Sequence, residues 1–170
     1  PYSGSAAARY YGDKKRVIAS TSGLETYPSR GDTVEFRVYK VGVKTEEGFG
    51  FGVQSEAFDE GYRVRIKNEN WQSGPQTATL RRFDGPGEDD EVTLDRTGYV
   101  PDDYREEYLR WEVQWGAPRI TVRAFDGSGE EILSLSATDS TYDTGGIAVS
   151  GNAPDPGALY VDGIRISETK

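Results

Sequence analysis

The sequence predicts an all-β fold built from two packed antiparallel sheets, and three features of the chain carry this prediction. Hydrophobic and polar residues alternate over many short segments, which is typical of strands that are buried on one face. The chain has 21 glycines and 11 tyrosines in 170 residues, and turn residues separate the alternating segments at intervals of about 8–15 residues. Blocks rich in helix-forming residues are almost absent from the sequence, so we expect hardly any helix.

The first half of the chain is expected to supply six strands after a loose lead-in at residues 1–14, of which Ala6–Tyr11 could close as an additional strand. The clearest alternation in this half covers Thr33–Val41, with apolar residues at every second position. From Gly48 to Gln54 one face of the strand carries glycines, which usually marks the close approach of a backbone or a ligand. The predicted strands are Lys15–Thr21, Thr33–Val41, Gly48–Gln54, Gly61–Lys67, Gln76–Phe83 and Glu91–Asp95.

The segment 108–116 is the one around which we expect the sheets to form. It places Trp111 and Trp115, two of the three tryptophans, on one face together with Leu109 and Val113. Because a tryptophan buries far more apolar area than an aliphatic side chain, this strand should lie in the core. Turn residues end this segment and the next, which predicts a meander of consecutive hairpins. The predicted elements of this half are a helical turn at Val100–Glu107 and strands at Tyr108–Gly116, Pro118–Asp126, Glu131–Ala137, Ile147–Ser150 and Ala158–Ser167.

Charge and missing residue types exclude several classes of function. The chain carries 29 acidic and 20 basic residues, a formal net charge of −9 at pH 7, so nucleic acid is not an expected partner. It has no cysteine and no histidine, which excludes disulfides, thiolate metal sites and catalysis by a histidine base. No apolar run approaches the roughly 20 residues of a membrane span, so membrane insertion is not expected. The acidic, lysine-poor composition resembles that of proteins from halophilic archaea, with an ordinary acidic mesophilic domain as the alternative.

A series of segments between Thr33 and Ile166 carries a resemblance to a known superfamily. The segments are Phe49–Gln54, Tyr62–Ile66, Leu80–Phe83, Trp111–Trp115, Ile120–Val122, Ser136–Tyr142, Gly145–Ile147 and Tyr160–Ile166. In this order they resemble the concanavalin A-like lectin/glucanase superfamily, with its laminin-G-like and jelly-roll carbohydrate-binding branches closest. The resemblance implies a single jelly-roll sandwich over residues 1–170, a sugar-binding sheet face or loop rim, and a structural calcium ion.

An outward-facing row of polar and aromatic residues is the candidate glycan site. Planar guanidinium and amide groups offer paired hydrogen bonds to hydroxyls, and an aromatic ring stacks on the face of a sugar. A solvated sheet face stabilised by cross-strand ion pairs is the alternative interpretation. The candidate ligand-binding residues are Arg37, Tyr39, Arg63, Arg65, Trp71, Glu112 and Gln114.

The sequence offers no paired carboxylates for glycoside hydrolysis. Glucanases of the resembled superfamily carry Glu-x-Asp-x-x-Glu or Glu-x-Asp-x-Glu on one strand, a spacing that sets two carboxylates on one face. That motif is absent, and Glu112 shares its face with Arg110 and Gln114. We therefore expect a non-catalytic carbohydrate-binding or surface-interaction module of a larger, extracellular or cell-surface protein, beside other domains of that protein. A hydrolase or lyase and a purely structural domain of a surface or virion protein are the alternatives.

Asp162 is the candidate calcium ligand. By the alternation of the last strand it shares a face with Tyr160, Ile164 and Ile166, where a carboxylate is costly unless it is paired or liganded. In the resembled superfamily an acid at this place helps to bind a structural calcium ion. Its companions are expected in the loop from Leu24 to Asp32, because the first and last strands of a jelly roll often lie side by side. Oxygen ligands of this kind suit calcium. A turn cap or an ion pair with arginine is the alternative role for Asp162.

The acidic composition predicts that the chain becomes more stable as salt is added. Screening should reduce the repulsion between carboxylates, so the melting temperature should rise between low and molar salt. Thermal unfolding followed by circular dichroism across that range measures the effect. A melting temperature that stays flat or falls would contradict the halophilic interpretation.

Overall fold

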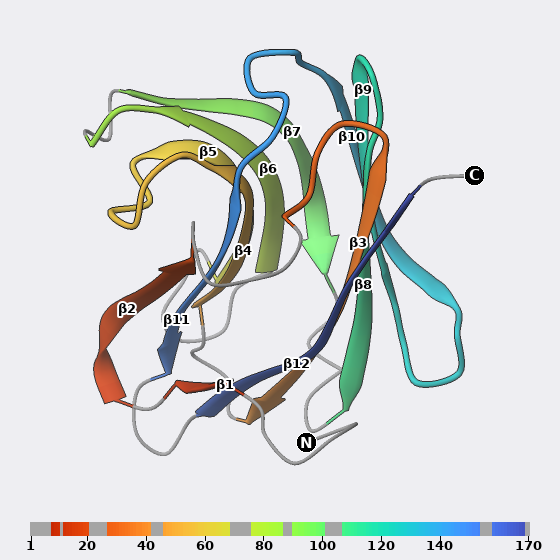
Figure 1. Ribbon diagram of the computed structural model, residues 1–170. Coiled ribbons are helices and arrows are strands. Elements are labelled where there is room, and N and C mark those ends of the chain that lie inside the picture. The colour runs from red at the N-terminus through yellow and green to blue at the C-terminus, as the bar shows by residue number, and fades with distance from the viewer. Residues whose placement is uncertain are drawn as a thin grey trace.

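Two antiparallel sheets packed face to face form the protein in the computed structural model (Figure 1). The structure describes residues 8–10, 12–20, 27–41, 46–68, 76–86, 90–100, 107–153 and 158–168. Sheet A has the strand order β1-β12-β3-β8-β9-β10, and sheet B has the order β2-β11-β4-β5-β6-β7. The strands are β1 (Ala8–Tyr10), β2 (Gly12–Ser20), β3 (Asp32–Val41), β4 (Glu46–Val53), β5 (Glu60–Asn68), β6 (Gln76–Asp84), β7 (Glu91–Val100), β8 (Tyr108–Trp115), β9 (Arg119–Phe125), β10 (Glu131–Thr138), β11 (Gly146–Ala153) and β12 (Ala158–Glu168). The predicted all-β sandwich is confirmed.

The main differences from the sequence prediction concern the first and last residues of the elements. β7 continues to Val100 instead of ending at Asp95, and β11 continues to Ala153. The additional strand allowed at Ala6–Tyr11 is present as β1, which pairs with β12. The expected lead-in at residues 1–14 also contains the start of β2, which pairs with β11. Most of the predicted helical turn, residues 101–106, lies outside the described residues. Within the described ranges no helix is long and apolar enough to cross a membrane.

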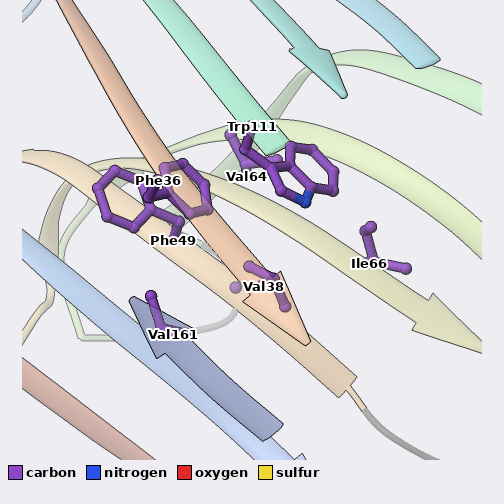
Figure 2. Close-up of a pocket in the computed structure, with 8 residues that line it drawn as sticks. Phe36, Val38, Phe49, Val64, Ile66, Trp111 and Val161 are labelled. Carbon is purple, nitrogen blue, oxygen red and sulfur yellow. The ribbon is translucent and has the colours of Figure 1, made fainter. Parts of the chain in front are cut away.

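The inward face of β8 lies at the centre of the core, as its alternation predicts. Trp111 and Trp115 are only 3% and 0% exposed. The ring of Phe36 in sheet A stacks on Phe49 of sheet B, with centroids 3.9 Å apart, and lies 6.1 Å from the Trp111 ring (Figure 2). Aromatic side chains therefore join the two sheets directly, and replacing one of them by alanine should cost about 3–5 kcal/mol.

A small apolar cavity lies between the sheets beside this stack (Figure 2). Its volume is about 20 Å³, and its lining consists of Phe36, Val38, Gly48, Phe49, Val64, Ile66, Trp111 and Val161. The Trp111 Nε1 atom has no hydrogen-bond partner among the described residues. A buried water needs about two to four polar partners, and this lining offers one, so the cavity should stay dry and is a packing gap.

The glycine-bearing face of β4 makes room for the protein's own side chains. A Cβ atom on Gly50 would lie 2.5 Å from the ring of Phe58, and one on Gly48 would lie 2.5 Å from Ser150 Oγ and 2.8 Å from Arg63 Nε. Arg63 reaches across β4 and donates to Ser150 Oγ at 3.0 Å. The close approach predicted from these glycines is confirmed, and the approaching groups are the protein's own phenylalanine and arginine.

The loop between β10 and β11 is fastened to sheet B by the carboxylate of Asp139. This carboxylate accepts hydrogen bonds from Tyr62 Oη at 2.6 Å, Thr141 N at 2.9 Å and Arg82 Nη1 at 2.6 Å. Burial alone would raise the pKa of Asp139, but the hydrogen bonds from Tyr62, Thr141 and Arg82 outweigh it and hold this pKa below its usual range. Burial, together with the bond to Asp139, raises the pKa of Tyr62 to about 12. Near neutral pH the loop is therefore held by a charged carboxylate and a neutral phenol.

We predict that Asp139→Asn destabilises the fold by roughly 1–3 kcal/mol near neutral pH, because an amide cannot replace these charge-assisted bonds. A carboxylate with a lowered folded pKa adds stability above its unfolded pKa of about 3.9, and this stability disappears as the pH falls through the folded pKa. The difference between wild type and variant should therefore narrow below about pH 4.

Urea unfolding at neutral and at acidic pH measures this difference. The matched control is Asp143→Asn, since the Asp143 side chain pairs with Arg30 but is 78% exposed. This substitution should lower the free energy of unfolding by less than about 1 kcal/mol. A cost of Asp139→Asn that is equal at both pH values would contradict the role given to the Asp139 charge.

Candidate functional site

The outer face of sheet A arranges its side chains in rows that cross neighbouring strands. Residues directly opposite each other in paired strands lie on the same face, so the strand register fixes the members of each row. Four successive rows are Tyr160, Tyr39 and Tyr108; Asp162, Arg37, Arg110 and Phe125; Arg165, Glu35, Glu112 and Arg123; and Ser167, Thr33, Gln114 and Thr121. We call the first the tyrosine row and the second the arginine row.

A cleft of about 510 Å³ opens on this face, where the first two rows meet the loop between β9 and β10. Asp126 shapes that loop, since its Oδ1 atom accepts hydrogen bonds from Ser128 Oγ at 2.7 Å and from the backbone nitrogens of Ser128 and Glu130 at 2.9 Å each. Pockets for small ligands commonly enclose about 300–1,000 Å³, so the cleft has a suitable size. It is lined by Arg37, Glu107, Tyr108, Arg110, Asp126, Gly127, Ser128 and Gly129.

Arg110 is held in the cleft by a ring and two carboxylates. Its guanidinium carbon lies 3.8 Å from the centroid of Phe125, and its Nη1 atom donates to Glu112 at 3.2 Å and to Glu35 at 3.5 Å. Arg37 lies directly opposite Arg110 on the neighbouring strand, where two like charges repel. Asp162 lies directly opposite Arg37 on its other side. The two arginines are therefore placed among carboxylates that offset their repulsion.

The tyrosine row continues the aromatic surface away from the cleft. The ring centroids of Tyr39 and Tyr108 are 4.9 Å apart with planes tilted by 40°, and those of Tyr39 and Tyr160 are 6.0 Å apart with planes tilted by 66°. Burial raises the pKa of Tyr108, and the negative charge of Asp162 acts in the same direction. The Tyr108 hydroxyl therefore stays protonated near neutral pH and can both donate and accept hydrogen bonds.

The structure divides the predicted ligand-binding residues between two faces of the sandwich. Arg37, Tyr39, Glu112 and Gln114 lie on the outer face of sheet A, whereas Arg63 and Arg65 lie on β5 and face outward from sheet B; Trp71 lies outside the described residues. The residues on sheet A and those on sheet B therefore cannot form the single row that was predicted. Alternation along a strand identifies its outward residues, but it does not say to which sheet the strand belongs.

The outer face of sheet B is filled by its own side chains. Arg63, Thr79 and Ser150 are only 3%, 4% and 0% exposed on that face. Arg81 donates to Thr79 Oγ1 at 2.9 Å and forms an ion pair with Glu91. A glycan would have to displace these contacts, whereas the cleft on sheet A is already open. The outer face of sheet A is therefore the better candidate site.

The structure corrects the face expected for Asp162. The register shifts between Asp162 and Arg165, where Gly163 has a φ of 65° and donates its backbone N–H to Asp162 Oδ1 at 2.7 Å. This β-bulge inserts residues that simple alternation does not count. Asp162 consequently lies on the outer face, opposite Arg37, while Ile166 lies opposite the fully buried Val34.

The two residues predicted to bind calcium lie apart. Asp162 is opposite Arg37 and Asp32 is opposite Glu168, and the five-residue interval along β3 corresponds to about 16 Å. Asp32 Oδ2 instead accepts hydrogen bonds from Ser29 N at 2.7 Å and Ser29 Oγ at 2.9 Å, which caps the turn before β3. In the ranges that the structure describes, no group of three or more acidic side chains could hold a metal ion. One ion held jointly by Asp162 and Asp32 does not fit this arrangement.

Calcium binding by the chain stays a prediction. A melting temperature lowered by chelator, together with a loss of that response in Asp162→Asn, would support a site at Asp162. Identical melting temperatures in chelator and in millimolar calcium would contradict a calcium site at Asp162.

Glu35 is a candidate site residue that the sequence pattern does not reveal. It lies directly opposite Glu112, and opposed residues bring their Cβ atoms within about 4.5–5.5 Å, close to the carboxylate spacing of retaining glycosidases. Arg110 contacts both carboxylates. Hydrolysis needs an acid and a nucleophile that both face the bound sugar, whereas neither Glu35 nor Glu112 lines the cleft. The pair therefore balances the charge of Arg110.

No family model and no curated protein matches the sequence, but solved structures share its fold. The carbohydrate-binding module CBM66 from Bacillus subtilis has a TM-score of 0.66 at 11% identity, covering 96% of this chain and 91% of that one. The exoplasmic/lumenal domain of VIP36, in a form bound to Ca²⁺ and Man3GlcNAc, has a TM-score of 0.67 at 11% identity, covering 95% and 80%. CG-16, a homodimeric agglutinin from chicken liver, has a TM-score of 0.60 at 11% identity, covering 91% and 100%. The chain thus has the sandwich fold of these lectins and binding modules.

Proposed function

We propose that this protein is a non-catalytic carbohydrate-binding domain that binds glycan in the cleft on the outer face of sheet A. The observation that carries the proposal is the cleft itself, because Arg37, Arg110 and Tyr108 line the same opening. Guanidinium groups offer paired hydrogen bonds to hydroxyls, and an aromatic ring stacks on the apolar face of a sugar. The fold shared with lectins and carbohydrate-binding modules supports the same class of ligand.

The surroundings of the cleft favour a site that is formed before the ligand arrives. Arg110 is held by Phe125, Glu35 and Glu112, and the loop opposite it is held by the hydrogen bonds of Asp126. Side chains that are already ordered lose little conformational entropy on binding, which favours affinity. A glycan chain that leaves the cleft would pass over the remaining members of the tyrosine row.

We further propose that the domain works as a module of a larger secreted or cell-surface protein, beside other domains. Support comes from the similar structures, one of which is named as a carbohydrate-binding module and another as an exoplasmic/lumenal domain. A purely structural domain of a surface protein is the alternative. An unbiased glycan array separates the two, since the structural alternative expects no ligand.

We predict that Tyr108→Ala and Arg37→Gln each weaken binding of the glycan found on the array by roughly 1–3 kcal/mol, the scale of a buried anchor. The first change removes a stacking surface, and the second removes the planar donor fork. Isothermal titration calorimetry measures both losses, and thermal unfolding checks that each variant is folded. The matched control is Arg123→Ala on the same face, whose side chain is 39% exposed and lies outside the cleft. Equal affinities in all three variants, or an array without a hit, would contradict the proposed site.

We also predict that the purified protein does not cleave polysaccharides, because Glu35 and Glu112 both pair with Arg110 and neither lines the cleft. Release of reducing ends from a panel of polysaccharides measures this activity. Release that disappears in Glu112→Gln would contradict the prediction and favour the hydrolase alternative.

A further inference from the structure

We infer that the ligand of this cleft is a single chain of an uncharged glycan, and not an acidic polysaccharide or the surface of a crystalline one. The inference rests on the proposed function and adds to it the class of glycan. Three independent properties of the outer face of sheet A carry it: the charge balance around the arginines, the tilt of the tyrosine rings and the shape of the cleft.

The arginines of the cleft have carboxylates close by. Arg110 donates to Glu112 at 3.2 Å and to Glu35 at 3.5 Å, and Asp162 lies directly opposite Arg37. The lining of the cleft itself adds two further carboxylates, Glu107 and Asp126, to the two arginines. The carboxylate or sulfate of an acidic sugar would have to compete with these groups, and it would meet no surplus of positive charge.

The net charge of the whole chain also disfavours an acidic glycan. The formal net charge is −9 at pH 7, so the field around the protein repels a polyanion as it approaches. Added salt screens such repulsion beyond about 10 Å at 0.1 M. An uncharged chain meets no such barrier, and its binding should depend little on ionic strength.

Balanced ion pairs are well suited to hydroxyl groups. A hydroxyl donates one hydrogen bond and accepts others, and an arginine beside a carboxylate presents donors and acceptors within reach of each other. Arg110 with Glu112 forms such a pair at the cleft, and the protonated hydroxyl of Tyr108 offers both roles in one group. The polar groups of the site therefore match a neutral polyol.

The tyrosine row does not form a flat platform. The planes of Tyr108 and Tyr160 are tilted by 40° and 66° from the plane of Tyr39. A crystalline polysaccharide offers a planar array of sugar faces, and rings stack on such an array only when they are coplanar. Rings that face different directions, next to an open cleft of about 510 Å³, fit the changing ring faces of one twisted chain.

Affinity electrophoresis and calorimetry with three classes of polymer test the inference. The probes are soluble neutral polysaccharides (mannan, mixed-linkage β-glucan and fructan), acidic ones (alginate, polygalacturonate and heparin), and crystalline cellulose and chitin. Each is measured at about 0.05 M and about 0.5 M NaCl, where screening differs strongly. Wild type, Tyr108→Ala and the control Arg123→Ala are compared throughout.

We expect at least one neutral polymer to bind, with an affinity that changes less than about twofold with salt and falls at least about fivefold in Tyr108→Ala but not in Arg123→Ala. Binding only of acidic polymers, weakening at least about tenfold with salt, or binding only to the crystalline polymers, would overturn the inference while the proposed function stands. Binding of no polymer from any class would refute the proposed function and the inference with it.

Discussion

The stacking of Phe36 in sheet A on Phe49 in sheet B, with Trp111 beside Phe36, determines which side of each strand faces inward. The ring centroids of Phe49 and Trp111 lie 3.9 Å and 6.1 Å from that of Phe36. All three side chains are at most 3% exposed. A shift of one residue in the register of β8 would expose Trp111 and bury Arg110 and Glu112, at a large cost in apolar burial and charge desolvation. The packing of the core therefore determines which side chains form the rows on the outer face of sheet A.

Those rows give the candidate site its chemistry. Because β3 lies between β12 and β8, three tyrosines fall side by side and the arginines fall among carboxylates. The strongly acidic chain thus presents one face on which positive and negative groups balance. On the outer face of sheet B, by contrast, the glycines of β4 leave room for Arg63 and Phe58, and these two side chains fill the surface.

The parts of the structure that depend on local pattern could be predicted from the sequence. Alternation identifies the buried tryptophans of β8 and the outward direction of Arg37 and Arg65, because a side chain's face depends only on its own strand. The sheet that contains each strand is set by contacts distant in sequence, so alternation could not separate Arg65 from Arg37. It could not pair Glu35 with Glu112 either. The bulge after Asp162 adds a local irregularity that periodicity misses, so Ile166 lies on the face opposite to Asp162, whereas Tyr160 shares its face as expected.

Glycan binding by the outer face of sheet A is tested most directly by mapping backbone amide chemical shifts during titration with an oligosaccharide that binds. We expect the largest changes at Arg37 in β3, Tyr108 in β8 and Ser128 in the β9–β10 loop, which line the cleft. Changes concentrated instead on Arg65 and Thr79, on the outer face of sheet B, would contradict it.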